Sequence, residues 1–355
     1  MLGRAQAFCS QFGLRLPIML SPMAGVPAPA LSVAVANAGG LGACGALLMT
    51  PDSIRDWALQ FRRQSTGAFQ LNLWIPGCAP VRDPANEAAV RAFLARFGPS
   101  VPTEDAETAA PDFIAQCEAL IAARPTVISS IMGLYQPSMV AAMRAHDIAW
   151  FATVTTVAEA IAAEAAGADA VVAQGFEAGG HRGAFCPQTA ESGAVGLFSL
   201  LPAVVDAVAI PVVAAGGIAD ARTIAAALTL GASAVQIGTG FLRTPEAKLE
   251  PAWANALGTT LPEGTMLTRA FSGRAGRSIA TSFVRAAADA ESPPPAPYPV
   301  QRALTQRMRQ CATTVGDIER MQAWAGQSGA LARTEPAGVL AQALWAGARN
   351  LMTGG

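Results

Sequence analysis

One of the two histidines in this chain of 355 residues stands in a glycine-rich stretch that is suited to chemistry. His181 follows Gly179 and Gly180 in the segment Gln174-Gly175-Phe176-Glu177-Ala178-Gly179-Gly180-His181-Arg182-Gly183, directly after an apolar run. An imidazole titrates near neutral pH, and glycines let the backbone approach a ligand closely. The pattern favours a proton-handling group over the alternative, a surface loop that happens to carry a histidine.

Two further glycine-rich turns follow apolar runs later in the chain, at Gly216-Gly217 and at Gly238-Thr239-Gly240. Backbone N–H groups in such turns can hold a phosphate, especially where a helix begins. The segment Gly40–Gly45 also matches GxGxxG, but it follows a predicted helix and opens a predicted strand. A dinucleotide fingerprint has the reverse order, so we exclude a tightly bound NAD there.

Other kinds of catalytic site find little support. No serine lies in a GxSxG elbow, and the six cysteines form no CxxC pair, which indicates free thiols in a reducing, cytoplasmic compartment and no metal site. Glu177 is the one carboxylate near the histidine, and orienting a neighbour or pairing with Arg182 suits it as well as a reactive role does. A site this poor in reactive groups indicates that a bound cofactor supplies the chemistry.

The elements that must position these residues form a repeating strand–helix pattern. Eight short apolar runs predict strands at 17–21, 41–46, 69–75, 126–132, 149–154, 168–174, 211–215 and 233–238. Predicted helices lie between them at 28–38, 52–64, 137–145, 157–166, 198–208 and 220–230. Strands that are apolar on both faces and alternate with helices predict an α/β fold, a (β/α)8 TIM barrel, in preference to an open doubly wound sheet.

In such a barrel the chemistry occurs where the strands end at their carboxyl side. His181 and both glycine-rich turns belong to that side. His146 instead ends a predicted helix on the opposite side, where a helix dipole favours it, so we assign it a structural role.

Two regions do not fit the repeat. The barrel is predicted over 1–75 and 112–260, and the segments 76–111 and 261–355 are predicted to form a helical cap beside its mouth, on the substrate side. Helices are predicted there at 87–97, 301–311, 315–324 and 337–351.

Charge and hydropathy exclude two classes of partner. The net charge of −1 gives no basis for binding nucleic acid. The segment 16–50 carries no charge, but its many prolines and glycines are incompatible with a membrane-spanning helix.

Four segments resemble the nitronate monooxygenases, formerly called 2-nitropropane dioxygenases, in order along nearly the whole chain. They are Pro17–Ala24 (PIMLSPMA), Gln174–Gly183 (QGFEAGGHRG), Ala214–Asp220 (AAGGIAD) and Gln236–Phe241 (QIGTGF), and the EAGGH stretch is the most specific. Ser272–Arg277 (SGRAGR) is similar to a further family segment.

The resemblance implies an FMN-dependent barrel that oxidises alkyl nitronates, with nitroalkanes as an alternative substrate, by O2 to a carbonyl compound and nitrite. His181 would face the substrate, as the catalytic residue. The flavin ring and phosphate would be bound by Pro22, Met23, Ala24, Asn72, Gln174, Gly179, Gly180, Ala215, Gly216, Gly217, Gln236, Gly238, Thr239 and Ser272.

The chain departs from the family pattern in places. Arg302 and Gln306 stand where members have a tyrosine and a lysine, Ile131 replaces a histidine of some members, and Gly240 replaces a larger residue. Tyr298 is either a pocket residue or part of a proline-rich linker, and Arg274 has no assigned role.

Two other functions stay open. One is an NAD(P)H-dependent flavin reductase of the enoyl-acyl-carrier-protein reductase or quinone reductase type, which shares this barrel. The other is a barrel that binds a phosphorylated ligand without redox chemistry.

Overall fold

The computed structural model describes residues 2–24, 28–106 and 111–354, and its largest element is an eight-stranded parallel sheet. The strands are β1 (Ile18–Leu20), β2 (Gly42–Gly45), β3 (Phe69–Trp74), β4 (Val127–Ile131), β5 (Ala149–Val154), β6 (Ala170–Gln174), β8 (Val212–Ala215) and β9 (Ala234–Ile237). The sheet order is β1-β9-β8-β6-β5-β4-β3-β2. The Leu41 N–H donates to the Ile18 carbonyl at 3.0 Å and the Leu20 N–H to the Leu41 carbonyl at 2.8 Å, which bridges the outer strands. The predicted (β/α)8 barrel is confirmed.

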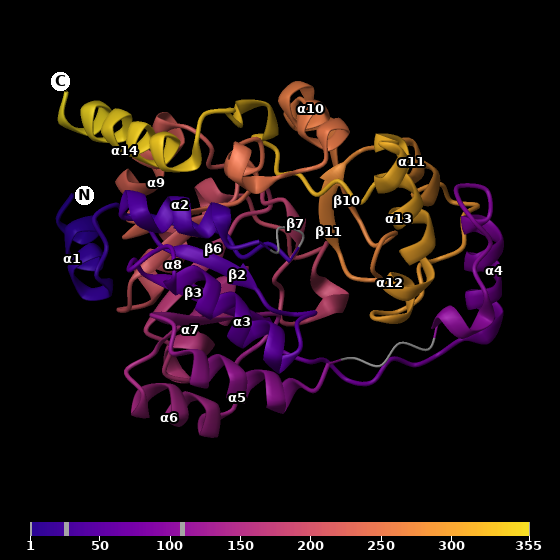
Figure 1. Ribbon diagram of the computed structural model, residues 1–355, viewed down its shortest axis with the longest axis horizontal. Helices are drawn as coiled ribbons and strands as arrows, with labels where there is room; N and C mark the ends of the chain where they lie inside the picture. The colour runs from indigo at the N-terminus through magenta and orange to yellow at the C-terminus, as the bar shows by residue number, and fades with distance from the viewer. Residues whose placement is uncertain (1, 25–27, 107–110, 355) are drawn as a thin grey trace.

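Helices surround this barrel on its outer side (Figure 1). They are α2 (Ala30–Ala38), α3 (Pro51–Arg62), α5 (Phe113–Ala123), α6 (Pro137–Ala145), α7 (Val157–Ala165), α8 (Leu197–Ala207) and α9 (Ala221–Thr229). Several begin at a side chain that accepts a backbone N–H, such as Thr50 before α3 and Asp220 before α9. Each helix covers apolar strands that would otherwise face water.

An N-terminal helix that the sequence reading did not predict closes one end of the barrel. In α1 (Leu2–Phe12), Phe8 and Phe12 are buried, and the Phe12 ring meets Phe151 of β5 edge to face at 4.9 Å. Both phenylalanines share a buried cluster with Met19, Val127 and other strand residues. A ligand can therefore approach from the other end, where the strands finish.

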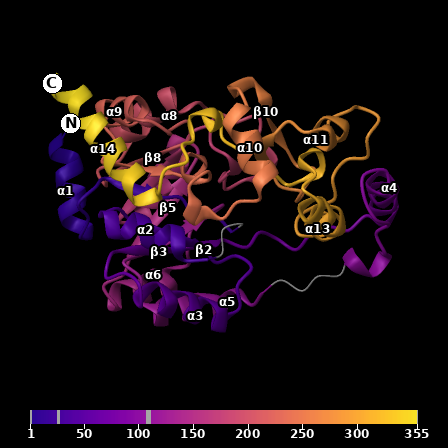
Figure 2. The ribbon, with the colours of Figure 1, turned by 45° about the horizontal axis from the view of Figure 1, so that its top comes forward.

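A second body of helices lies beyond that open end (Figure 1 and Figure 2). It contains α4 (Pro84–Leu94) from the predicted insertion together with α11 (Ser282–Ala287), α12 (Val300–Leu304) and α13 (Gln306–Val315). A buried cluster joins these distant segments, including Phe93, Leu94, Phe283, Leu304 and Met308. We call this body the cap. Of the predicted insertion 76–111, residues 107–110 lie outside the described part of the chain.

A three-stranded antiparallel sheet connects the histidine loop to the segment before the cap helices. Its strands are β10 (Thr265–Thr268), β11 (Gly276–Ile279) and β7 (Gly180–His181), in the order β10-β11-β7. The sequence did not predict this sheet, because its strands are short and β7 and β11 each begin with a glycine instead of an apolar run.

Two predictions in the C-terminal region are wrong. The predicted helix 315–324 does not form, because α13 ends at Gly316 in a left-handed conformation (φ 70°) and only a short 3-10 turn, Ile318–Arg320, follows. The last helix, α14 (Ala337–Thr353), was grouped with the cap, but its stripe of Ala337, Leu340 and Leu344 packs on the barrel beside α2 and α9. Periodicity identified its apolar face but carried no information on the partner of that face. No helix within the described ranges is both long and apolar enough to cross a membrane.

Candidate active site

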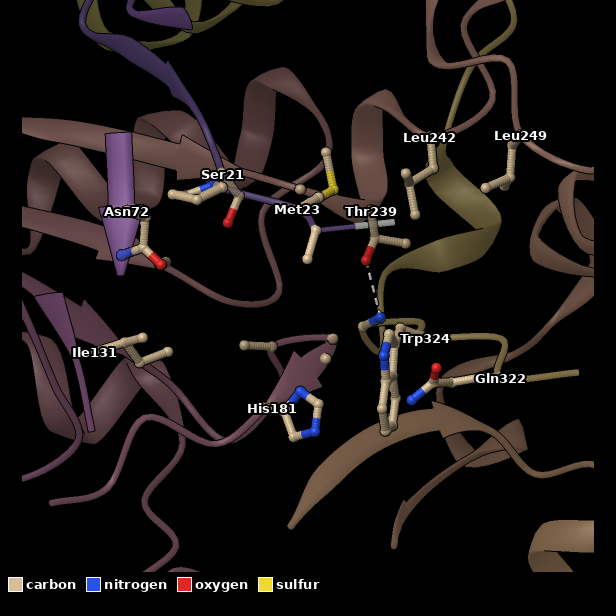
Figure 3. Close-up of a pocket in the computed structure, with 18 of the residues that line it drawn as sticks. Ser21, Met23, Asn72, Ile131, His181, Thr239, Leu242, Leu249, Gln322 and Trp324 are labelled. Atoms are coloured by element: carbon tan, nitrogen blue, oxygen red, sulfur yellow. Dashed lines mark hydrogen bonds between the residues drawn. The ribbon is translucent and has the colours of Figure 1, made fainter. Parts of the chain in front are cut away.

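A cavity of about 800 Å³ lies at the carboxyl ends of the barrel strands, between the barrel and the cap. Its walls come from the strand ends, the histidine loop, the turns after β8 and β9, and residues 302–328. Figure 3 shows Ser21 and Met23 on one side of this space and His181 and Trp324 on the other. The volume lies in the range of small-molecule and cofactor sites.

The structure places almost every residue singled out from the sequence at this cavity. Those that line it are Pro22, Met23, Ala24, Asn72, Gln174, Gly179, Gly180, His181, Ala215, Gly216, Gly217, Gln236, Gly238 and Thr239. Ser272 is the exception: it is only 1% exposed and lies behind His181.

Gln174 holds the histidine loop in place. Its Nε2 donates to the carbonyl of His181 at 3.0 Å, and its Oε1 accepts the N–H of Gly183 at 2.8 Å. The guanidinium of Arg182 also donates to the Gln174 carbonyl, at 2.7 Å. One amide side chain at the end of β6 thus holds the returning arm of the loop at His181 and Gly183.

The turns after β8 and β9 supply unpaired backbone donors. The N–H groups of Gly217, Gly238 and Thr239 make no hydrogen bond to another described residue. Gly216 and Gly217 adopt φ of 104° and 69°, which favour glycine. The Thr239 Oγ1 accepts the N–H of Gly326 at 3.0 Å, the dashed line in Figure 3, and so ties the turn to the opposite wall.

His181 is enclosed by aromatic rings. Trp74 and Trp324 meet its imidazole edge to face, with centroids 4.6 and 4.8 Å away. Its Nε2 lies 2.7 Å from the Ser272 Oγ, and its Nδ1 has no hydrogen bond within the described part of the chain. Burial, followed by the positive charges of Arg274, Arg302 and Arg309, lowers the pKa of His181 to about 3. The imidazole is therefore neutral at physiological pH.

The cap side of the cavity carries positive charge. Arg302 and Arg309 both line the cavity, and Arg309 is held by a bond from its Nη1 to the Gln322 Oε1 at 3.1 Å. Burial and repulsion from Arg302 lower the pKa of Arg309 to about 10, which leaves it protonated at neutral pH. The two guanidinium charges favour an anionic ligand.

The two carboxylates near the cavity, Glu177 and Glu250, accept hydrogen bonds from backbone N–H groups. Glu177 accepts the N–H of Leu197 with both oxygens, at 2.9 Å each, and so stabilises the start of α8. Glu250 lines the cavity, but its Oε2 accepts the N–H of Trp253 at 2.9 Å. Three roles were expected as alternatives for Glu177, namely orienting a neighbour, pairing with Arg182 or reacting, and this contact corresponds to the first. No cluster of potential metal ligands occurs among the described residues.

Sequence reasoning missed several wall residues, all of them in or beside the irregular regions: Trp74, Arg309, Gln310, Met321, Gln322 and Trp324. Tyr298 does not line the cavity and instead packs on Trp74, with ring centroids 5.3 Å apart. Ile131 does line it, whereas Gln306 is exposed. Of the missed residues, only Trp74 could have been identified from the sequence, because it lies beside Asn72 at the end of a predicted strand.

The family model described as nitronate monooxygenase matches residues 7–347. The chain belongs to the nitronate monooxygenase family. A nitronate monooxygenase from Paraburkholderia phytofirmans is 37% identical over 341 residues, which cover 94% of this chain and 93% of the relative.

Two solved structures show the same architecture. Nitroalkane oxidase from Streptomyces ansochromogenes has a TM-score of 0.88 at 36% identity, covering 98% of this chain and 99% of its own. FabK from Thermotoga maritima has a TM-score of 0.76 at 26% identity, covering 98% and 97%. The protein is therefore an enzyme of a flavin-dependent monooxygenase family.

Proposed function

We propose that this protein binds FMN and oxidises alkyl nitronates with O2 to a carbonyl compound and nitrite. The observation that carries the proposal is a neutral histidine facing a cavity with two arginines on its wall. A nitronate is an electron-rich anion, so it can give up electrons without a strong base in the site. Family membership supports the same reaction.

The residues present fit an FMN group. Unpaired N–H groups of Gly217, Gly238 and Thr239 suit a phosphate at the turns after β8 and β9. A Cβ built on Gly180 would meet no atom within 4 Å, so this cavity-lining glycine leaves open space against the histidine loop. Asn72 donates its Nδ2 to Ser129 at 3.0 Å, which leaves its Oδ1 as an acceptor for a bound ring.

The side chains that line the cavity have separate roles in this reaction. Bound FMN would accept electrons from the substrate and pass them to O2. Arg302 and Arg309 attract the anion, and Trp74, Ile131 and Trp324 surround its alkyl part and exclude water. His181 bonds a nitronate oxygen or takes the proton of a nitroalkane. Its pKa of about 3 makes it a poor base, so the nitronate is the favoured substrate.

Anaerobic mixing tests the proposal. The purified protein, loaded with FMN, is mixed with preformed ethyl nitronate or with NADH, and the flavin absorbance is followed. We expect bleaching by the nitronate and, in air, nitrite release without NADH. Bleaching by NADH alone would favour the reductase alternative. A protein that takes up no FMN would contradict both.

A further inference from the structure

Ser272 is buried against the candidate catalytic histidine and has no contact with the cavity. Its side chain is 1% exposed, and its Oγ lies 2.7 Å from the His181 Nε2. The residue was expected from the resemblance to bind the cofactor. Its position instead connects it to the substrate through the imidazole.

The surrounding backbone holds both partners rigidly. Ser272 lies in a turn in which its own N–H and that of Gly273 donate to the Arg269 carbonyl, at 3.2 and 2.8 Å. The carbonyl of Phe271 accepts the Thr305 hydroxyl at 2.7 Å, which ties the turn to the cap. His181 is held by its pairing with Gly276 and by Gln174. The distance between the two side chains is therefore a property of the fold.

The lengths of the contacts indicate which atom carries the proton. The 2.7 Å separation is typical of a hydroxyl donor, whereas N–H groups usually donate over about 2.9–3.0 Å. The other possible acceptor for the hydroxyl, the Arg274 carbonyl, is 3.3 Å away, at the weak end of the range. The Arg274 N–H donates to the same Oγ, also at 3.3 Å, and so uses one of its lone pairs.

We propose that Ser272 is a positioning residue: its hydroxyl donates to the Nε2 of His181 and fixes the neutral imidazole as the Nδ1–H tautomer. His181 then presents an N–H donor to the substrate. A donor suits an oxygen of an anionic nitronate, whereas removal of a proton from a neutral nitroalkane would need a lone pair at that atom. The consequence for the substrate rests on the proposed function, but the tautomer does not.

The test is nitrogen NMR of the FMN-loaded protein labelled with ¹⁵N-histidine. The chain has only two histidines, and the variant His146→Gln, altered at the exposed end of α6, assigns the signals of His181. We expect a protonated Nδ1 and an unprotonated Nε2 near neutral pH. A protonated Nε2 in the wild-type protein would overturn the proposal without any variant at position 272.

Variants at Ser272 provide a second test of the proposed tautomer. In Ser272→Ala we expect the Nε2–H form to appear and kcat/KM for ethyl nitronate to fall on the order of tenfold, with flavin still bound. Ser272→Thr keeps the hydroxyl and should restore both the tautomer and most of the rate, which a purely structural role would not predict. An unchanged tautomer in Ser272→Ala would overturn the inference even if nitronate is oxidised. A changed tautomer would support it even if nitronate is not.

Discussion

Gly276 lies directly opposite His181 in the antiparallel pair that β11 forms with β7. A Cβ built on Gly276 would stand 3.0 Å from the Trp324 ring and 3.2 Å from the Gly180 carbonyl. The small residue on β11 therefore lets the indole approach the imidazole. The segment before the cap helices shapes the proposed substrate side of the cavity in this way, while the proposed flavin side is built from barrel turns.

Gly276→Ala should displace the Trp324 indole and leave the proposed flavin turns intact. We expect a lower rate of nitronate oxidation, by about tenfold, with FMN binding unchanged. Steady-state kinetics and flavin absorbance check this. Gly3→Ala is the matched control, because its Cβ would meet nothing within 4 Å. Loss of flavin from Gly276→Ala would mean that β11 also supports the cofactor.

His181→Gln should slow the reduction of bound flavin by ethyl nitronate on the order of 100-fold, since a hydrogen-bond donor placed at developing charge has about that effect. Stopped-flow absorbance under anaerobic conditions measures it. The flavin spectrum should stay that of the wild-type protein, because the proposed phosphate turns lie on other loops. His146→Gln, at the opposite end of the barrel, should react at the wild-type rate.

Arg302→Met should raise the KM for a nitronate more than it lowers kcat. Arg302 lines the cavity, and its side chain makes no hydrogen bond to a described residue, so the main loss is attraction for the anion. We expect an increase of about tenfold at low ionic strength that shrinks as salt is added. Arg63→Met, at an exposed arginine after α3, controls for the change in net charge. A KM equal to wild type would exclude Arg302 from substrate binding.

Gly179→Ala should push the histidine loop away from residues 325–326, the segment after the cap that packs against it. Its Cβ would stand 2.4 Å from the Gly326 nitrogen and 2.6 Å from the Ala325 carbonyl carbon, and backbone atoms cannot give way easily. We expect loss of FMN or a lower melting temperature, measured by flavin fluorescence and by thermal unfolding. Wild-type behaviour in both would show that the loop has more room than its contacts indicate.

Local sequence signals were sufficient for the barrel. Apolar runs that follow Gly40, Gly67, Gly167 and Gly231 marked the starts of strands, because a parallel strand is buried on both faces and a glycine ends the preceding helix. Because the active sites of such barrels lie at the carboxyl ends of the strands, His181 and the glycine turns were predicted to lie at one end. The structure brings them to one cavity.

The residues on the cap side of the cavity could not be predicted from the sequence in the same way. The Trp324 ring contacts His181 and the charge of Arg309 lowers its pKa because distant segments of the chain pack together, and no periodicity encodes that packing. Ser272 shows the same limit, since its motif was identified but its partner was not. Helix 315–324 failed because the effect of Gly316 on the chain direction outweighed the apolar residues that follow it.

The folded protein should lose stability as pH falls from about 6.5 to about 3, in part because of His181. An unfolded histidine binds its proton at about 6.5, whereas the folded pKa is about 3, so in this window the unfolded state holds the proton that the folded state rejects. The contribution of His181 to stability is therefore fully present above pH 6.5 and is lost on acidification, by up to about 1.4 kcal/mol per pH unit.

His181→Gln removes this contribution and should flatten the pH dependence. Urea unfolding between pH 5 and 8, at fixed excess FMN, gives the free energy of unfolding for both proteins. Carboxylates with lowered pKa values also weaken the fold in acid, as for Glu87 with its hydrogen bond from Arg82, but they are common to both proteins and cancel in the difference. The free energy of unfolding of the wild type minus that of the variant should decrease as pH falls. A difference that is constant with pH would mean that His181 titrates normally in the folded state, and the arginines on the cap side would then have little effect on its proton.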